Sequence, residues 1–270
     1  MILDGKLVSN EIKSELKKYI DDNNLKIGMA VIQVGDNPAS NVYIKNKAKV
    51  AESLGVNFEH YKFDIDITED VIISKIEKLN NNDNIHGIIV QLPLPEHLDK
   101  DLIVNSINEE KDIDGLTSKN IGNLFSNSEG IISCTPYGIM KLLEYYNIDL
   151  EGKNAVIVGR SNLVGKPLVE LLLRKNATVT ICHSKTKKLK DYTKKADILI
   201  AAVGKKHLIT KNMVKKGAVI VDVGINREDN KLYGDVDFDK VKNKASYITP
   251  VPGGIGPMTV AMLFYNLIKK

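Results

Sequence analysis

The 270-residue sequence is poor in cysteine and has no long hydrophobic run. Its two cysteines, Cys134 and Cys182, are too few for a disulfide framework, and nothing requires them to pair, which fits a reducing compartment. No apolar stretch approaches the roughly 20 residues of a membrane-spanning helix, and the N-terminal segment is typical of an amphipathic helix. We therefore expect a cytoplasmic protein with no membrane contact.

Metal-binding patterns are also missing. The five histidines show no metal-ligand spacing. Asp235, Asp237 and Asp239 begin like a calcium loop, but Lys240 stands where glycine is needed, and Ser246 stands where a bidentate glutamate belongs. The sequence therefore predicts no bound metal.

The charge balance argues against a nucleic-acid partner. The 38 basic and 34 acidic side chains give a net charge of +4, and the Lys-rich stretch 185–195 is most simply a solvated helix face. A hydrophobic share of 43% and a charged share of 27% are typical of a globular protein with a proper core. At this length we expect two domains.

What the sequence does contain is a nucleotide-binding pattern. Residues 155–185 predict a strand, a glycine turn, a helix with a leucine stripe and a second strand. The ATP-type phosphate loop is excluded, because five residues rather than four separate Gly159 from Gly165. What remains is a variant dinucleotide turn in which Ser161 replaces the usual second glycine and backbone N–H groups face a pyrophosphate. A structural turn without a ligand is the alternative.

The end of the second strand bears on the choice of cofactor. NAD-preferring sites place an acidic residue about 20 residues beyond the glycines to bind the ribose 2′-hydroxyl. Here the strand at 178–182 is followed by His183, Ser184 and Lys185, and Arg160 lies in the turn. These donors and charges suit a 2′-phosphate, so we expect NADP.

Helices and strands alternate along the rest of the chain, which is typical of a parallel sheet. In the first half the sequence predicts helix 5–22, strand 27–34, helix 38–54, strand 56–63, helix 69–80, strand 86–91 and helix 99–107. In the second half it further predicts a helix at 136–147 capped by Thr135, strands 197–202 and 218–223, a Gly/Pro-rich loop at 249–259 and a last helix. Loops that follow strands are where α/β sheets bind ligands.

Tyr43 and Lys47 are four residues apart in the helix expected at 38–54, so they share a face. Alone, such a pair is more often a surface coincidence than a site. Tyr-x-x-x-Lys also marks short-chain dehydrogenases, but in those enzymes the pair follows the glycine turn, whereas here it lies well before the turn. That interpretation is therefore disfavoured.

Five segments stand out when they are taken together. They are VGDNPASNVYIKNK (34–47), VQLPLP (90–95), KDIDGL (111–116), GRSNLVGKP (159–167) and PGGIGPMT (252–259). In this order and spacing they resemble the bifunctional methylenetetrahydrofolate dehydrogenase/cyclohydrolase family across nearly the whole chain. One departure is Ser133, which stands where a proline usually precedes Cys-Thr-Pro.

The resemblance implies an α/β fold with two domains and a bound folate between them. It implies an N-terminal parallel-sheet α/β catalytic domain at 1–120, a C-terminal Rossmann-type dinucleotide-binding domain for NADP at 121–255, and a helix at about 256–270 that packs back on the first domain. The implied activity is oxidation of 5,10-methylenetetrahydrofolate by NADP to the 5,10-methenyl cation, then hydrolysis to 10-formyltetrahydrofolate, within one-carbon metabolism and purine biosynthesis. A homodimer is implied as well.

The resemblance also implies which residues act. Lys47 is expected as the essential lysine held by Gln91, with Asp114 as the pterin anchor and Tyr43 stacking on the folate; these four are the expected catalytic residues. Further substrate-binding residues are expected to be Val90, Leu92, Pro252, Gly253 and Gly254. The expected cofactor-binding residues are Gly159, Arg160, Ser161, Gly165, Ser184 and Ile225.

Plainer alternatives stay open for these residues and for the function. Lys47 is otherwise an exposed helix lysine, Gln91 a polar residue at a strand end, and Asp114 a turn residue. One alternative function is a family member that has kept the dehydrogenase and lost the hydrolase. Another is a non-catalytic folate or nucleotide sensor, which predicts damage at Tyr43, Lys47 or Asp114, and all three are intact.

Overall fold

The structure, a computed structural model, describes residues 1–229 and 231–269. The chain divides into two compact units. We call residues 11–134 and 263–270 the three-stranded unit, and residues 1–10 and 135–262 the five-stranded unit, after their sheets. The first ten residues therefore belong with the second half of the chain.

The three-stranded unit is built on a parallel sheet with β1 (Gly28–Val34) at its centre. On either side of β1 lie β2 (Asn57–Phe63) and β3 (Gly87–Val90). All of β1 is buried, whereas the edge strand β2 has no fully buried residue. Parallel neighbours need a crossover connection, and α2 (Pro38–Leu54) and α3 (Glu69–Asn80) supply the two crossovers.

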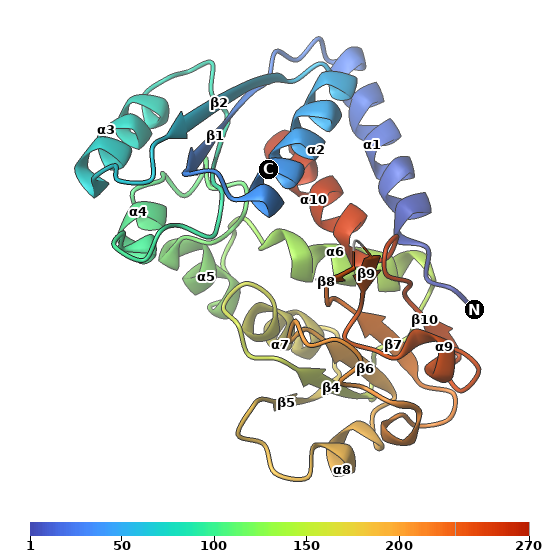
Figure 1. The fold of residues 1–270 in the computed structure, drawn as a ribbon. Coiled ribbons are helices and arrows are strands. Elements are labelled where there is room, and N and C mark those ends of the chain that lie inside the picture. The colour runs from blue at the N-terminus through green and yellow to red at the C-terminus, as the bar shows by residue number, and fades with distance from the viewer. Residues whose placement is uncertain (230, 270) are drawn as a thin grey trace. The chain divides into compact units, whose positions relative to one another are not determined.

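One face of this sheet packs on α3 and on α4 (Lys100–Asn105), as Figure 1 shows. Ile72, Ile76 and Leu79 lie on one stripe of α3 at helical spacing and are buried against the strands. The other helices with residues in this unit are α1 (Gly5–Asp22), α5 (Ser118–Phe125) and the end of α10 (Ile255–Lys269). The core thus fixes the strand ends from which the loops of the site emerge.

The five-stranded unit has a parallel sheet in the order β10-β7-β6-β4-β5. Its strands are β4 (Asn154–Val158), β5 (Thr178–Cys182), β6 (Ile198–Ala201), β7 (Val219–Asp222) and β10 (Tyr247–Ile248). The chain runs from β4 to β5 on one side and then to β6 on the other, so the strand order reverses at β4. Its helical segments are α6 (Cys134–Tyr145), α7 (Gly165–Leu173), α8 (Leu189–Thr193), η1 (Lys211–Met213), α9 (Phe238–Val241) and the start of α10.

The parallel sheets and the α/β fold confirm the fold class that the sequence predicts, but two local predictions differ from the structure and one hairpin was not predicted. Helix α6 begins at Cys134, so Thr135 lies inside the helix rather than at its cap, and its hydroxyl lies 3.0 Å from that of Thr259. In the Lys-rich stretch 185–195 the helix is shorter than predicted, because only α8 is helical and the residues on either side of it are mostly turn. The sequence also gave no sign of the antiparallel hairpin formed by β8 (Asn226–Glu228) and β9 (Lys231–Tyr233).

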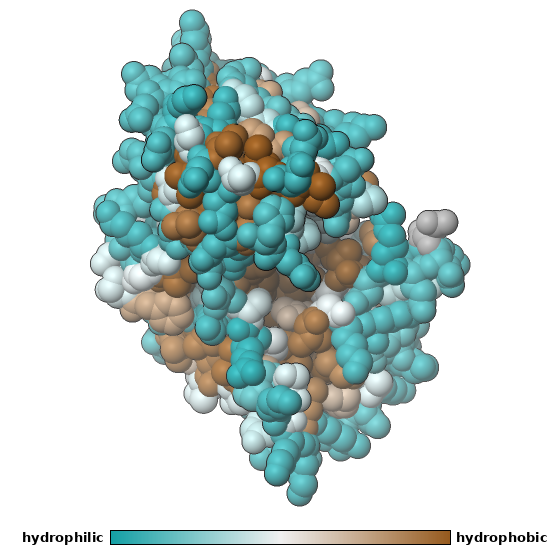
Figure 2. Space-filling view, turned by 60° about the vertical axis from the view of Figure 1, so that its left-hand side comes forward, coloured by the Kyte–Doolittle hydropathy of each residue, from teal (hydrophilic) through white to brown (hydrophobic). Residues whose placement is uncertain are grey.

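The polarity of the surface, the length of the helices and the state of the two cysteines bear on the expectations from the sequence. On the face seen in Figure 2, hydrophilic residues predominate and hydrophobic residues reach the surface in patches among them. Among residues 1–229 and 231–269, every helix is too short or too polar to span a bilayer. Cys134 and Cys182 are both buried free thiols.

Candidate functional site

Helix α2 positions the predicted pair Tyr43 and Lys47. The helix begins at Pro38, and the side chain of Asn37 caps it by accepting hydrogen bonds from the N–H groups of Ala39 and Ser40 at 3.0 and 3.1 Å. Tyr43 is 40% exposed, which leaves its ring available to a ligand.

Lys47 occupies an unusual place on this helix. The buried residues of α2 are Ser40, Ile44, Ala51 and Leu54, and Lys47 falls in the same stripe at helical spacing. A stripe of this kind normally faces the core, so a lysine in it is costly unless its amine has a partner. Lys47 is accordingly only half-exposed, which argues against a merely solvated helix lysine.

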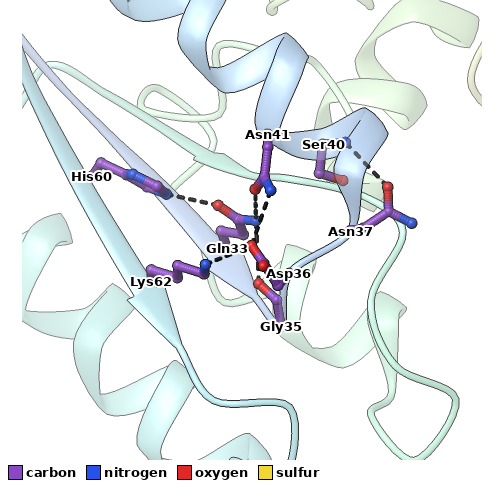
Figure 3. A network of polar contacts seen from close by, with 8 residues as sticks. All are labelled: Gln33, Gly35, Asp36, Asn37, Ser40, Asn41, His60 and Lys62. Carbon is purple, nitrogen blue, oxygen red and sulfur yellow. Dashed lines mark hydrogen bonds and ion pairs between the residues drawn. The ribbon is translucent and has the colours of Figure 1, made fainter.

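A network of polar side chains anchors the start of α2 to the sheet (Figure 3). Gln33, buried near the end of β1, donates through Nε2 to the carbonyl of Gly35 at 3.2 Å and to Oδ1 of Asn41 at 2.7 Å. Its Oε1 therefore serves as the acceptor for Nε2 of His60 on β2 at 2.9 Å. Asn41 also donates to Asp36 at 2.9 Å, and the network fixes the helix that carries Tyr43 and Lys47.

Gln91 meets Lys47 from the end of β3. Its backbone N–H donates to the carbonyl of Ile32 at 2.8 Å, which continues the sheet ladder by one residue. Its Nε2 donates to the carbonyl of Leu92 at 2.8 Å, so its Oε1 is left to accept from Nζ of Lys47 at 3.1 Å. The amide is thus held at both ends and fixes the direction of the lysine amine.

Asp114 lies on a loop held by a different, buried carboxylate. Asp112 is 1% exposed and accepts hydrogen bonds through Oδ2 from the N–H of Thr117 at 2.8 Å and from Asn120 at 2.9 Å. Burial raises the pKa of Asp112, and these donors oppose that shift. Asp112 therefore organises the loop, while Asp114, two residues on, is only half-buried.

The buried thiol of Cys134 is influenced by both Asp114 and Lys47. Burial raises the pKa of Cys134 well above its usual range, the charge and hydrogen bonding of Asp114 raise this pKa further, and the charge of Lys47 lowers it. Both charged groups therefore act on the same buried atom. Within the three-stranded unit, Lys47 is thus hydrogen-bonded to Gln91, and Lys47 and Asp114 both influence the thiol of Cys134.

Sequence reasoning missed Asn266, which supports the Asp114 loop from α10. This buried side chain donates to the carbonyls of Ile113 at 3.0 Å and Ile132 at 2.9 Å. Ile113 directly precedes Asp114, and Ile132 lies in the segment before Cys134, so Asn266 links these two segments. An asparagine in the middle of a strongly apolar helix is the signal that could have revealed it.

The glycine turn after β4 leaves no room for side chains. Gly159 has φ +132, and a Cβ there would overlap the carbonyl oxygen of Ala202, while a Cβ on Gly165 would overlap the carbonyl oxygen of Gly159. Ser161 braces the turn, because its Oγ accepts from the N–H of Val164 at 3.1 Å. The turn then opens helix α7, and this close backbone path is what a dinucleotide pyrophosphate requires.

The remaining predicted cofactor residues lie at the carboxyl ends of neighbouring strands. The N–H of Gly159 donates to the carbonyl of Cys182 at 2.9 Å, so the turn adjoins the end of β5 and the exposed Ser184. Arg160 is exposed in the turn, and Ile225, after β7, is 46% exposed. Serine and arginine with no acidic residue after β5 suit a phosphate on the ribose.

The other predicted substrate residues divide between the two units. Val90 and Leu92 flank Gln91, and the side chain of Val90 is buried in the core. Pro252, Gly253 and Gly254 belong to the five-stranded unit, where the carbonyl of Gly253 accepts from the N–H of Lys6 at 2.9 Å. Within residues 1–229 and 231–269 the structure holds no His, Cys, Asp and Glu cluster suited to a metal ion.

Comparison with known proteins accounts for both halves of the chain. Residues 3–114 match the catalytic domain of the tetrahydrofolate dehydrogenase/cyclohydrolase family, and residues 133–270 match its NAD(P)-binding domain. The bifunctional protein FolD of Agathobacter rectalis is 51% identical over 99% of this chain and 98% of its own.

Solved structures agree with the sequence matches. The bifunctional FolD enzyme of Campylobacter jejuni is 51% identical with a TM-score of 0.97, covering 100% of this chain and 97% of its own. The Trypanosoma brucei enzyme, solved with NADP cofactor and inhibitor, is 34% identical with a TM-score of 0.94, covering 99% and 95%. With its whole length matched in sequence and in fold, the chain belongs to the tetrahydrofolate dehydrogenase/cyclohydrolase family.

Proposed function

We propose that Lys47, Gln91, Tyr43 and Asp114 carry out the two reactions of this family in this chain. The protein oxidises 5,10-methylenetetrahydrofolate with NADP to the 5,10-methenyl cation and hydrolyses the cation to 10-formyltetrahydrofolate. The observation that carries the assignment of residues is the 3.1 Å hydrogen bond from Nζ of Lys47 to Oε1 of Gln91. A solvated lysine would need no such partner.

For the oxidation, the main task of the protein is to orient the folate and the cofactor. A hydride leaves a carbon that lies between two nitrogens, and the nitrogens stabilise the cation that remains. NADP supplies the hydride acceptor. Tyr43, exposed on the ligand side of α2, stacks on the folate, and the carboxylate of Asp114 accepts hydrogen bonds from the pterin amino and N–H groups. Together they hold the reacting carbon in a fixed place.

The hydrolysis requires a group that accepts a proton from water. Water adds to the methenyl carbon, its proton is removed, and a carbon–nitrogen bond then breaks to give the formyl product. Lys47 is the group that takes and returns the proton, and Gln91 is the positioning residue that directs the amine. Val90 and Leu92, on either side of Gln91, are further substrate-binding residues of the proposal, as are Pro252, Gly253 and Gly254 of the five-stranded unit.

The five-stranded unit suits NADP. The side-chain-free turn at Gly159 and Gly165 fits a pyrophosphate, and Ser161 braces it. Arg160 and Ser184 would hold the 2′-phosphate, and Ile225 would line the site. In this proposal the folate domain, expected at 1–120, is the three-stranded unit, and the NADP domain, expected at 121–255, is the five-stranded unit. The units differ from these bounds because residues 1–10 belong to the five-stranded unit and residues 121–134 to the three-stranded unit, together with the end of α10.

Three further properties belong to the same proposal. We infer a homodimer, a cytoplasmic location and a supply of formyl groups to purine biosynthesis, all on the strength of family membership.

A spectroscopic assay of the purified protein tests the proposal. With 5,10-methylenetetrahydrofolate and either NADP or NAD, reduced nicotinamide and the methenyl intermediate are followed together. We expect reduction with NADP in preference to NAD and no accumulation of the methenyl intermediate. Accumulation would indicate a dehydrogenase without effective hydrolase, and no reduction by folded protein that binds folate would indicate a sensor.

A further inference from the structure

Asp235 is a fully buried carboxylate that binds a loop of exposed residues. Its Oδ2 accepts from the N–H groups of Val203 at 2.7 Å and Gly204 at 3.1 Å. Its Oδ1 accepts from the N–H of Lys205 at 2.7 Å and from Nδ2 of Asn226 at 3.0 Å. Four hydrogen bonds fill the accepting capacity of the carboxylate, and three of them come from consecutive backbone groups.

The loop that Asp235 holds follows β6, at the point where the strand order reverses. Strands β4 and β6 are neighbours, and the chain leaves β4 toward β5 on the opposite side. In open α/β sheets a ligand binds in the crevice outside the strand ends at such a reversal. One wall of this crevice is the Gly159 turn, and the other is the loop at 202–205, since the N–H of Ala202 donates to the carbonyl of Val158 at 2.8 Å.

A second buried carboxylate joins the next loop to this wall. Asp222, at the end of β7, accepts through Oδ1 from the N–H groups of Gly224 at 3.0 Å and Asp235 at 2.9 Å. Its Oδ2 accepts from the N–H of Val236 at 2.9 Å. The loop that carries Ile225, a proposed cofactor residue, is therefore tied to the loop after β6 through Asp222, Asp235 and Asn226.

We propose that Asp235 is a positioning residue for NADP, because its carboxylate locks the loop after β6 and the Ile225 loop into one rigid wall of the cofactor crevice. The proposal rests on the proposed function and adds to it a residue that does not touch the ligand. Two carboxylates held this close disfavour each other's charge. Burial and then the nearby Asp235 raise the pKa of Asp222 to about 6, against the pull of three backbone N–H donors. Such a costly arrangement is typical of a functional site.

The test compares Asp235→Asn with Asp197→Asn in the full-length protein. Asp197 also binds backbone, the N–H of Asn154 at 3.0 Å, but it does so at the start of the same strands, away from the crevice. We expect Asp235→Asn to raise the dissociation constant for NADP, measured by calorimetry, ten- to hundredfold, and Asp197→Asn to leave it unchanged. Hydrolysis of 5,10-methenyltetrahydrofolate supplied directly should stay within twofold in both variants, because that step uses Lys47.

Three results would overturn the proposal: an unchanged NADP dissociation constant in folded Asp235→Asn, an equal rise in Asp197→Asn, or a parallel loss of hydrolysis in folded protein. If Asp235→Asn does not fold, Asn226→Ala is the test in its place. This variant removes one hydrogen bond to the Asp235 carboxylate and should raise the dissociation constant for NADP three- to tenfold. No change there would also contradict the proposal. A failure of the proposed function is distinguishable, because the unaltered protein would then neither reduce NADP nor hydrolyse the methenyl substrate.

Discussion

The two regions that we propose as the substrate site and the cofactor site are built on opposite principles. In the three-stranded unit, side chains from α2, β3 and the Asp114 loop converge, and their chemistry matters: an amine, an amide and a carboxylate. In the five-stranded unit, the path of the turn after β4 depends on two positions without a side chain, since neither Gly159 nor Gly165 has room for a Cβ. One region should therefore be sensitive to changes of functional group and the other to changes of volume.

Adding one methyl group to the turn is the strongest test of the difference. Gly159→Ala forces a Cβ against the carbonyl of Ala202 at a φ of +132, so we expect NADP binding to weaken about a hundredfold, or about 3 kcal/mol. Hydrolysis of methenyl substrate should persist. Gly152→Ala is the matched control, because it has a φ of +68 with nothing within 4 Å. Equal effects of both variants on NADP binding would show that backbone strain weakens binding, and not the loss of space in the Gly159 turn.

Changing one atom of the anchor tests the other region. Asp114→Asn keeps the volume, removes the charge and turns one acceptor oxygen into an NH2 donor, so one hydrogen bond to the pterin is lost and the KM for folate should rise roughly tenfold or more. The NADP dissociation constant should not change. Asp83→Asn, an exposed residue of the same unit, is the control. A normal KM in Asp114→Asn would remove the anchor role.

The smallest effect is expected for the exposed arginine of the turn. Arg160→Ala should lower the preference for NADP over NAD by about three- to tenfold, because solvent screens a surface charge. The effect should shrink as salt is raised. Lys175→Ala, which is exposed beyond the end of α7, should leave the preference unchanged. An unaltered preference in Arg160→Ala would shift the selection of the 2′-phosphate to Ser184 and its neighbours.

The parts of the fold that the sequence predicts well are those with a regular period. The strands β1, β3, β4, β6 and β7 are short buried runs, and α2 and α3 have caps at Asn37 and Thr68 that mark where they begin. The start of α6 was predicted wrongly because Thr135 resembles a helix cap, whereas the helix begins one residue earlier, at Cys134. Cys134 is buried and Thr135 is half-buried. Tertiary contacts, here the Thr135–Thr259 contact, override the local signal.

For the proposed site, too, only some of the residues could be predicted from the sequence. The motif residues Lys47, Gln91 and Asp114 could be named from the sequence, whereas their supports could not. Asn266 and Asp235 are far along the chain from most of the groups that they hold, and Asp235 suggested only a rejected calcium loop. Residues that act through backbone hydrogen bonds leave no spacing pattern, so only the folded structure reveals them.

The most direct measurement is to assay both reactions with Lys47→Ala. The dehydrogenase is followed as reduced nicotinamide and the hydrolase as loss of 5,10-methenyltetrahydrofolate, each against the unaltered protein. If Lys47 takes the proton in hydrolysis, that step should be abolished while much of the dehydrogenase remains, so the methenyl intermediate accumulates. An equal loss of both activities would contradict the account and show that Lys47 mainly positions the substrate.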